Sequence, residues 1–467
     1  MNDWLRKLGL DRPELRAWAM YDWANSAMMC TIITAVFPIY YEKVACAGMK
    51  REEATRWYAD ATTLAMVIIA VLGPLLGTMA DFNGRKKRML GGFMALGLAS
   101  IAGMFLIDTG DWVLASILFI LANIGANGSF VFYDALLPHI ARDDEVDRVS
   151  TAGYALGYLG GGGLLALNLA WIQKPEWFGL PSGANLTDAQ QTLPARLSFL
   201  SVAVWWLVFS IPLFRRVPEP PSAGLPAGYD PAAVLPVRAA VDRLIATGRG
   251  LRHYRQAFLM LLAFLIYNDG IGTIIRMAAP YATEIGIDQG IIIGSVVLVQ
   301  FVGIPCAFLF GALAGRIGAK RSIALGLTAY VGICIVGYFM RTGFHFLLLA
   351  FLVGAVQGGT QALSRSLFAS LVPRDKSGEF FGFFGTAEKF AGIFGPAIFG
   401  QINRWTGSSR GAILAVIAFF VAGGLLLALV DVPEGQRLAR AEEAQDLAAS
   451  TTAPQAVLDP DWGGAAN

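Results

Sequence analysis

Charged side chains stand inside several long apolar stretches of this sequence, where they could bind a polar or charged ligand. In the stretch 256–283, Asp269, Thr273 and Arg276 recur at spacings i, i+4 and i+7. A helix would place this acid, hydroxyl and base on one face. If the stretch spans a membrane, its charges are costly, and each is a functional hypothesis by default. The alternative is an ion pair that only fixes helix packing.

Carboxamides form two further rows, each ending in a charged residue. The rows recur at helical spacing, so each would occupy one face of a helix. They could bind a polar ligand, or they could hydrogen-bond neighbouring helices. The two rows are Asn123, Asn127 and Asp134, and Gln357, Gln361 and Arg365.

Two more sets of polar residues interrupt apolar stretches. Lys389 follows Glu388 directly, so on a helix the two should point about 100° apart, and at most one should face a cavity directly. Lys389 is a candidate partner for an anion or a carboxylate. Asp22, with Asn25 beside it, lies near the start of the first apolar stretch. We expect a gating role there, and hydration of the helix end is the alternative.

The elements that must position these residues are membrane-spanning helices. Of the 467 residues, 55% are hydrophobic and 15% are charged, whereas about 25% are charged in a typical globular domain. Helices are expected because backbone groups in lipid must be satisfied within the segment. The sequence predicts an all-α membrane protein with twelve transmembrane helices. The expected spans are 17–41, 58–80, 88–107, 112–136, 149–172, 197–214, 256–283, 289–314, 321–340, 344–370, 379–402 and 410–430.

The distribution of Lys and Arg predicts the orientation of these spans. With both termini in the cytoplasm, the cytoplasmic segments would hold about 24 of the 36 basic residues. The densest cluster is Arg85, Lys86, Lys87 and Arg88, after the second span. We therefore expect a multi-pass protein of the cell (inner) membrane with cytoplasmic termini. A net charge of +2 argues against a nucleic-acid partner, and four cysteines without a CxxC or Cys/His cluster argue against a metal site.

We expect four regions along the chain. They are an N-terminal six-helix half (1–214), a cytoplasmic linker (215–255), a C-terminal six-helix half (256–430) and a disordered cytoplasmic tail (431–467). The linker begins rich in Pro and Gly. Its second part, VRAAVDRLIATGRGLRHYR, has the pattern of a basic amphipathic helix, with a charged tether as the alternative.

The two halves are internal repeats. GTMADFNGRKKR at 77–88 matches GALAGRIGAKRS at 311–322, which places Gly77 on Gly311. FYDALLPHIA at 132–141 matches LFASLVPRDK at 367–376, and ALGYLGG at 155–161 matches FAGIFGP at 390–396. The matches come in the same order in both halves. A duplicated six-helix unit is typical of transporters that bind their solute between the halves, and a duplicated scaffold without transport is the alternative.

The loop after the second span, from Gly77 through Asp81, Gly84 and Arg85 to Lys86, resembles the characteristic loop of the major facilitator superfamily. WAMYDWANSA at 18–27, FPIYY at 37–41 and FVFYDALLP at 130–138 resemble its vacuole-effluxer-like branch, whose fungal members are autophagy-related vacuolar amino-acid exporters. The resemblance implies that spans one, four, seven and ten line a central cavity. It also implies that the loop latches the cytoplasmic side in the outward-open state.

Three of the loop residues are therefore gating candidates, namely Asp81, Gly84 and Arg85, together with Asp22, Asn25 and Asp134. An acid at the C-terminal end of a helix is poorly placed for its own helix dipole and needs outside partners. For Asp81 we expect Arg85, Arg142 or the N-terminal end of span eleven.

The expected function is secondary active transport of a small polar or zwitterionic solute, with amino acids among the candidates. An exporter or facilitator of organic anions or another metabolite, with Arg276, Arg365 and Lys389 as ligands, is the alternative. A signalling protein or a scramblase is more remote. We find no P-loop, HExxH or GxSxG motif, so we expect neither an enzyme nor a cofactor. Protons are candidate coupling ions, and we expect a monomer.

Overall fold

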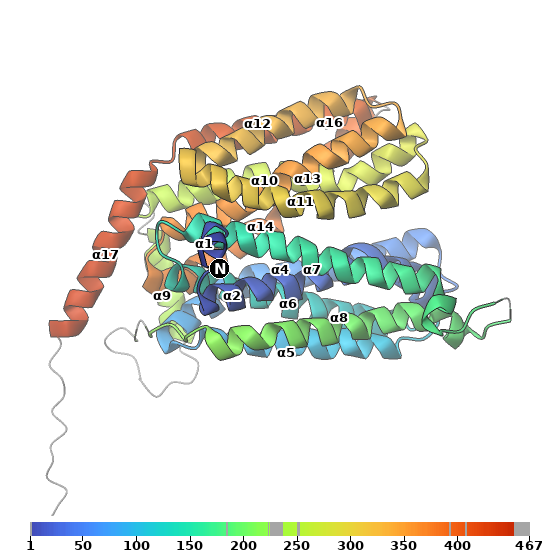
Figure 1. Cartoon of the computed structure of the whole chain (residues 1–467), viewed down its shortest axis with the longest axis horizontal. Coiled ribbons are helices and arrows are strands. Elements are labelled where there is room, and N and C mark those ends of the chain that lie inside the picture. Colours follow the sequence, from blue (N-terminus) through green and yellow to red (C-terminus); the bar gives the residue numbers. More distant parts are fainter. Residues whose placement is uncertain are drawn as a thin grey trace, which may run out of the picture.

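Long helices run side by side through the molecule and divide it into two bundles, drawn one above the other in Figure 1. The computed structural model describes residues 2–183, 185–222, 224, 237–249, 253–391, 394–406 and 409–452. A short helix, α1 (Asn2–Lys7), precedes the first bundle.

The first span is one continuous helix with two widened segments. It consists of α2 (Pro13–Ala27), η1 (Met28–Ala35), α3 (Val36–Tyr40) and η2 (Tyr41–Ala45), and η1 and η2 are π-helical. Pro38 lies three residues after η1. Because proline lacks the N–H group and its ring crowds the carbonyl four residues earlier, the turn before it widens. The rest of the first half is α4 (Arg51–Asn83), α5 (Lys86–Gly103), η3 (Met104–Leu106), α6 (Trp112–Ile140), α7 (Val146–Gln173), η4 (Pro175–Phe178) and α8 (Asp188–Arg216).

The second half repeats this order of helices, but its fifth spanning segment is divided into two helices, α14 (Ser377–Phe390) and α15 (Phe394–Thr406). The elements of this half are α10 (Arg255–Ile285), α11 (Gln289–Ile317), α12 (Ala319–Tyr338), α13 (Gly343–Ser370), η5 (Arg374–Lys376), α14, α15 and α16 (Ser409–Ala428). Eleven helices in the described residues are long and apolar enough to cross a membrane. The pair α14 and α15 forms the remaining crossing, so the twelve-helix prediction is confirmed.

Two polar helices flank the second half. α9 (Val237–Arg249) lies in the part of the linker for which an amphipathic helix is predicted. α17 (Val432–Thr452) lies where the sequence predicts disorder, so that prediction is wrong for these residues. The prediction of disorder did not consider that α17 packs on the rest of the protein. Ala439 of α17 is buried, and Glu442 accepts a hydrogen bond from Tyr254 at the start of α10. The remainder of the predicted tail, 453–467, lies outside the described residues.

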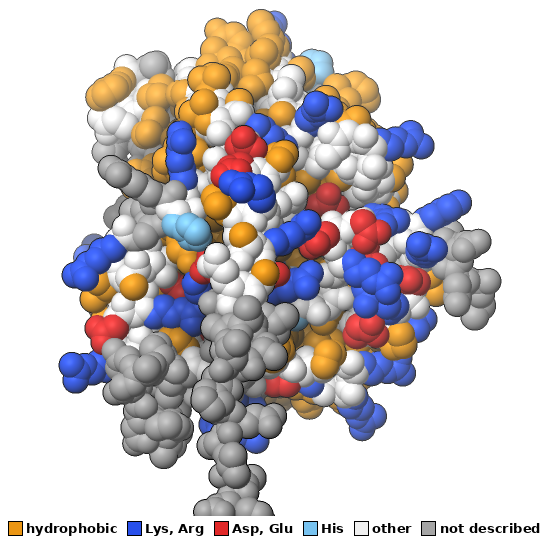
Figure 2. All heavy atoms as spheres, turned by 90° about the vertical axis from the view of Figure 1, so that its left-hand side faces the viewer, with side chains coloured by type: hydrophobic (Ala, Val, Ile, Leu, Met, Phe, Trp, Pro, Cys, Tyr) orange, Lys and Arg blue, Asp and Glu red, His pale blue; other side chains and the backbone are white. Residues whose placement is uncertain are grey.

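The N-terminus, α9 and α17 gather at one end of the bundle, on the left in Figure 1. We call it the linker end and the opposite end the far end. Figure 2 looks onto the linker end, where Lys and Arg side chains are frequent and interspersed with Asp and Glu. The basic clusters that the sequence analysis assigns to the cytoplasmic side lie at this end.

The two most extensive helix contacts between the halves are related by the repeat. α4 packs on α14, and α7 packs on α11. A Cβ atom added at Gly77 of α4 would lie 2.0 Å from the carbonyl oxygen of Gly378 of α14, and one added at Gly311 of α11 would lie 2.2 Å from Thr151 Oγ1 of α7. Real Cβ atoms do not approach so closely, so glycine permits this close packing at both positions. Gly77 and Gly311, which the repeat aligns, thus each allow a helix of one half to pack closely on a helix of the other half.

Candidate solute cavity

A cavity of about 1140 Å³ lies between the two halves. Its walls come from both bundles, and they include residues near the far end, such as Thr62, Met340 and Phe346. Toward the linker end the lining stops at three charged residues, Asp22, Asp134 and Arg365, which form the cavity floor. The volume is ample for a small organic solute.

The floor is a network of ion pairs that crosses from one half to the other. Arg365 extends from α13 of the second half, and its Nη1 lies 3.0 Å from Asp134 Oδ1 of α6. Its Nη2 lies 3.3 Å from Asp22 Oδ2 of α2. Arg365 also donates from Nε to Ser150 Oγ of α7 at 2.9 Å. All three charged residues are buried, so the network fastens α13 to three helices of the first half.

Aromatic rings surround the guanidinium. Its central carbon lies 4.8 Å from the ring centre of Trp18, 5.6 Å from that of Tyr133 and 4.7 Å from that of Tyr154. Tyr133 donates its hydroxyl hydrogen to Asp22 Oδ2 at 2.8 Å. Such rings stabilise a desolvated cation and hold it in place. Two carboxylates still face one guanidinium, so the floor carries excess negative charge when both acids are ionised.

A second network closes the linker end below the floor. Asp81, at the end of α4, accepts hydrogen bonds from the backbone N–H groups of Gly378 and Glu379, both at 2.9 Å. Lys86 Nζ lies 2.7 Å from Asp81 Oδ1. Asp81 therefore caps the N-terminal end of α14, where a negative charge is stabilised by the helix dipole. Of the three partners predicted for Asp81, the end of span eleven is the one found.

The basic partner of Asp81 is not the predicted one. Arg85 and Arg142 are exposed, and the buried cation beside Asp81 is Lys86. The reason is the turn at Gly84, which has φ of 56° and ends α4 in the left-handed region that favours glycine. After this turn a new helix begins at Lys86, so Lys86 and not Arg85 points inward. Gly84 thus positions the latch through its backbone.

The three residues of the predicted face on α10 separate in the structure. Thr273 and Arg276 line the cavity, whereas Asp269 is not among its described lining residues. Asp269 Oδ2 instead accepts a hydrogen bond of 2.8 Å from the N–H of Gly395, in the first turn of α15. In this conformation Asp269 therefore caps a helix, and its role in the solute path stays a prediction. Its carboxylate caps a helix that begins inside the membrane, a need that the pattern of α10 alone does not reveal.

The carboxamide rows divide in a similar way. Asn127, Gln357 and Gln361 line the cavity. Gln361 Nε2 donates to Asn268 Oδ1 at 3.2 Å. Asn123 is buried off the cavity and donates to the carbonyl oxygen of Phe119. Asn25 is likewise buried off it, beside Ser129. For both, helix packing is the role that these contacts indicate.

Lys389 and Glu388 both line the cavity, against the expectation that at most one would. They stand at the end of α14, where Lys389 Nζ lies 3.3 Å from Glu388 Oε2. Long side chains can turn toward each other there because the helix stops at Phe390. The C-terminal half therefore presents Arg276 and Lys389 as cations above the acidic floor.

Several lining residues are absent from the sequence-based candidates. Besides Glu388, they include Tyr58, Tyr154, Tyr158, Asn268 and Gln300. Gln300 could have been found, because it is an amide inside an apolar stretch, like Gln357. The tyrosines could not, because tyrosine is also common at membrane interfaces.

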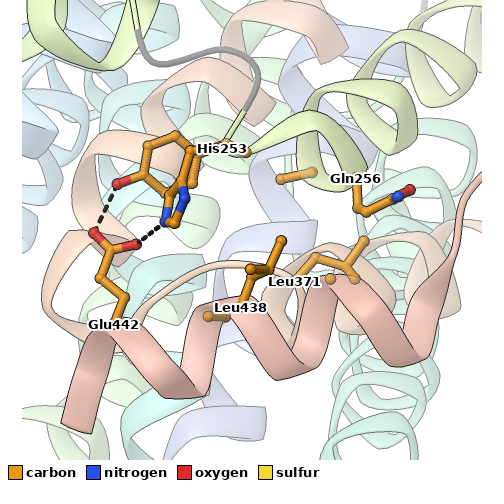
Figure 3. A pocket seen from close by; sticks show the side chains of 9 residues that line it. His253, Gln256, Leu371, Leu438 and Glu442 are labelled. Atoms are coloured by element: carbon orange, nitrogen blue, oxygen red, sulfur yellow. Dashed lines mark hydrogen bonds and ion pairs between the residues drawn. The ribbon is translucent and has the colours of Figure 1, made fainter. Parts of the chain in front are cut away.

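A small pocket elsewhere is too confined to bind a solute. It lies between the start of α10 and α17 and has a volume of about 10 Å³, close to the space of one water molecule. Figure 3 shows its apolar side at Leu371 and Leu438 and the carboxylate of Glu442 turned toward His253. The pocket is a docking contact of α17.

Comparisons with known proteins agree with this architecture. A sequence model of the family described as "Vacuole effluxer Atg22 like" matches residues 57–440. The chain belongs to this family. An uncharacterized MFS-type transporter, YxiO of Bacillus subtilis (strain 168), is 36% identical over 415 residues, which cover 89% of this chain and 94% of that protein. The chain is thus a multi-pass membrane transporter of the major facilitator type.

Fungal members of the family are more distant. Autophagy-related protein 22 of Yarrowia lipolytica (strain CLIB 122 / E 150) is 27% identical over 318 residues, or 62% of this chain and 51% of the fungal protein. Among solved structures, the transporter FucP in the outward conformation superposes with a TM-score of 0.68 at 12% identity, covering 90% of this chain and all of FucP. The proton:xylose symporter XylE gives a TM-score of 0.67 at 14% identity, covering 92% of this chain and 98% of XylE. These two likenesses show the fold.

Proposed function

We propose that this Atg22-like transporter carries a small zwitterionic solute by alternating access, with amino acids as the first candidates. The observation that carries the proposal is the placement of opposite charges along one cavity. The floor offers the carboxylates of Asp22 and Asp134, and the second half offers Arg276 and Lys389 above them. A solute with an ammonium and a carboxylate group fits both sets, and the amides of Asn127 and Gln357 can bind its polar atoms.

The floor also suggests how binding drives the conformational change. To open the linker end, Arg365 must separate from Asp22 and Asp134, because they belong to different halves. Breaking a buried pair without replacement costs about 3–5 kcal/mol. A solute ammonium group, or a proton, placed at these carboxylates would replace Arg365 and reduce that cost. The solute or the coupling ion would then be required for the transition.

The orientation belongs to the same proposal. We infer that the linker end is cytoplasmic, because the predicted basic clusters lie there, which makes the described conformation outward-open. A reporter that is active only in the periplasm should stay inactive when fused after α17, and one active only in the cytoplasm should be active. The reverse pattern would place the cavity mouth in the cytoplasm.

The test of the solute class is counterflow in proteoliposomes. Vesicles loaded with one unlabelled compound are given the labelled compound, across amino acids, organic acids, sugars and nucleosides. We expect amino acids to exchange and Asp22→Asn to lower exchange by tenfold or more. Exchange of sugars or nucleosides without amino acids would contradict the zwitterion proposal.

Organic anions are the second candidate, because Arg276 and Lys389 both line the cavity. In that case the ammonium site would be dispensable. Organic acids without an amino group would exchange, and Arg276→Gln would lower their exchange far more than Asp22→Asn.

A further inference from the structure

The linker helix α9 has two different long faces. One face is buried: Ala239 and Ala240 pack on Met79 and Phe82, in the last turns of α4. On the other face the aliphatic side chains Val237, Val241 and Ile245 are 44%, 41% and 45% exposed. Their spacing of four residues aligns them in one stripe along the helix. None of the described lining residues of the cavity belongs to α9.

The buried face links the two halves at the latch. Arg243 of α9 lies over the Phe82 ring of α4, with its central carbon 4.9 Å from the ring centre. Its Nε donates to Glu379 Oε2 of α14 at 3.0 Å, and its Nη2 lies 3.6 Å from Asp375 Oδ2. Glu379 is fully buried, and its own N–H binds Asp81. One arginine therefore bridges the α4 and α14 sides of the Asp81 latch.

The exposed stripe lies at the depth of a membrane surface. Met79 and Phe82, on which α9 rests, belong to the last turns of a spanning helix that ends at Asn83. The stripe is bordered by two exposed arginines, Arg238 and Arg249, with the exposed Asp242 beside them, so this border carries a net charge of +1. Aliphatic side chains bordered by arginines are the pattern of a helix that lies in the interface of a bilayer with anionic lipids.

We propose that α9 is an interfacial helix that binds anionic lipid headgroups with its outer face and holds the latch closed with Arg243. Insertion of Val237, Val241 and Ile245 between headgroups would fix α9 against α4. Since Arg243 is carried on the same short helix, lipid binding would stabilise the contact with Glu379 and hence the closed linker end. The closed state is then more populated in an anionic membrane.

Hydrogen exchange of the full chain in lipid nanodiscs tests this proposal. Nanodiscs of phosphatidylcholine alone are compared with nanodiscs that also contain phosphatidylglycerol. We expect the anionic lipid to slow exchange of the α9 amides by about fivefold, as a net charge of +1 near an anionic surface implies. The amides at the start of α14, including Gly378 and Glu379, should exchange more slowly as well.

Two variants and a control separate the faces of α9. Arg238→Gln with Arg249→Gln should abolish the effect of phosphatidylglycerol on both segments. Arg243→Gln should keep the effect on α9 but lose it at the start of α14. Arg437→Gln, which removes an exposed arginine of α17, should keep both effects.

Three outcomes would overturn the proposal. The first is equal exchange of α9 in the two lipids, and the second is a lipid effect that survives the glutamine pair. The third is protection that follows the ratio of protein to lipid and not the lipid charge, which would assign the stripe to a second copy of the chain. No solute enters the measurement, so the result is independent of the proposed substrate.

Discussion

Two helix contacts between the halves, α4 with α14 and α11 with α7, are related by the internal repeat, yet they are built differently. We call them the first and the second seam. In the first seam, α4 meets α14 through Gly77 and Gly378, backbone against backbone. In the second, α11 meets α7 through Gly311, which receives the hydroxyl of Thr151. The first seam also carries the Asp81 latch, whereas Gly315 stands where the repeat would place that acid. Among the described residues, nothing lies within 4 Å of a Cβ added at Gly315.

This difference assigns different roles to the seams. A seam closed by a buried ion pair and two backbone hydrogen bonds has one favourable arrangement and loses several contacts at once when it opens. A seam closed by small residues can slide over a short distance without leaving charges unpaired. We infer that the first seam switches and that the second follows it.

The largest expected effect comes from the same substitution at the two related glycines. Gly77→Ala places a Cβ 2.0 Å from a backbone oxygen that cannot turn away, so α4 and α14 must separate and the Asp81 hydrogen bonds must break. Gly311→Ala meets Thr151 Oγ1, a side-chain atom that can rotate. We expect Gly77→Ala to reduce the rate of counterflow by a hundredfold or more and Gly311→Ala by about tenfold, as overpacking of 1–3 kcal/mol implies.

A second-site change distinguishes the two seams further. Thr151→Ala should restore transport to Gly311→Ala, because it removes the colliding hydroxyl. For Gly77→Ala no such rescue exists at Gly378, which has no side chain. Equal rates for the two alanine variants would contradict the assigned difference between the seams.

The next effect concerns the latch charge. Asp81→Asn leaves Lys86 buried without its carboxylate partner, which destabilises the closed seam by about 3–5 kcal/mol. Transport should slow strongly while solute affinity stays within a few fold, because Asp81 does not line the cavity. Spin labels at Arg88 and Arg321, two exposed residues at the starts of α5 and α12, should report a wider linker end. Unchanged turnover at normal expression would remove Asp81 from the gate.

The sequence patterns were sufficient to predict features that recur at regular spacing along one helix. The spans and the two halves follow from hydropathy and from the matched glycines, and the cavity-facing positions of Thr273, Arg276, Gln357 and Gln361 follow from helical spacing. Lys86 was missed because the left-handed turn at Gly84 resets the phase of the next helix. A spacing argument that continues the phase of α4 selects Arg85 instead.

Partners that lie far apart in the sequence could not be predicted in this way. Arg365 binds Asp22 across 343 positions, and nothing local to either residue names the other. Asp269 has the expected helical phase within α10, but its partner is the backbone N–H of Gly395. That N–H is available to Asp269 only because the eleventh span is divided into α14 and α15. The glycines in this span do not predict the division, because they are equally compatible with close packing of an unbroken helix.

The smallest expected effect is at the edge of the molecule, where α17 crosses from one half to the other. Glu442 pairs with Lys376 and accepts a 2.7 Å hydrogen bond from Tyr254, while His253 Nε2 lies 3.1 Å from its other oxygen. Arg440 reaches Asp143 of the first half at 2.8 Å, but both are more than half exposed, so this pair contributes little. Glu442 therefore makes the charged contacts of α17 that are best shielded from solvent, beside the packing of Ala439 and a hydrogen bond from Arg374 N–H to Glu443.

The pH dependence of this attachment follows from two opposite shifts. Burial raises the pKa of Glu442, but the hydrogen bonds from Lys376 and Tyr254 outweigh it and hold that pKa below the ordinary 4.5. Its stabilisation is therefore present above pH 4.5 and is lost as the pH falls through the lowered pKa. For Lys376, burial lowers the pKa, but the bonds to Glu442 and Tyr254 raise it above 10.5, so its contribution is lost only in strong alkali. Docking should be constant between these limits and weaken in acid.

Spin labels at Arg437 on α17 and Arg88 on α5 would measure this docking. We expect a single distance from pH 5 to 9 and a broader distribution below pH 4. Glu442→Gln should broaden the distribution already at neutral pH. The undocked population should rise about fivefold, since a partly exposed charged hydrogen bond contributes about 1 kcal/mol. The substitution should also remove the acid transition, whereas Glu434→Gln, on an exposed part of the same helix, should leave both unchanged. An acid transition that persists in Glu442→Gln would assign the attachment to other groups, and Glu443, which accepts a 2.8 Å hydrogen bond from the N–H of Arg374, would then be the first to test.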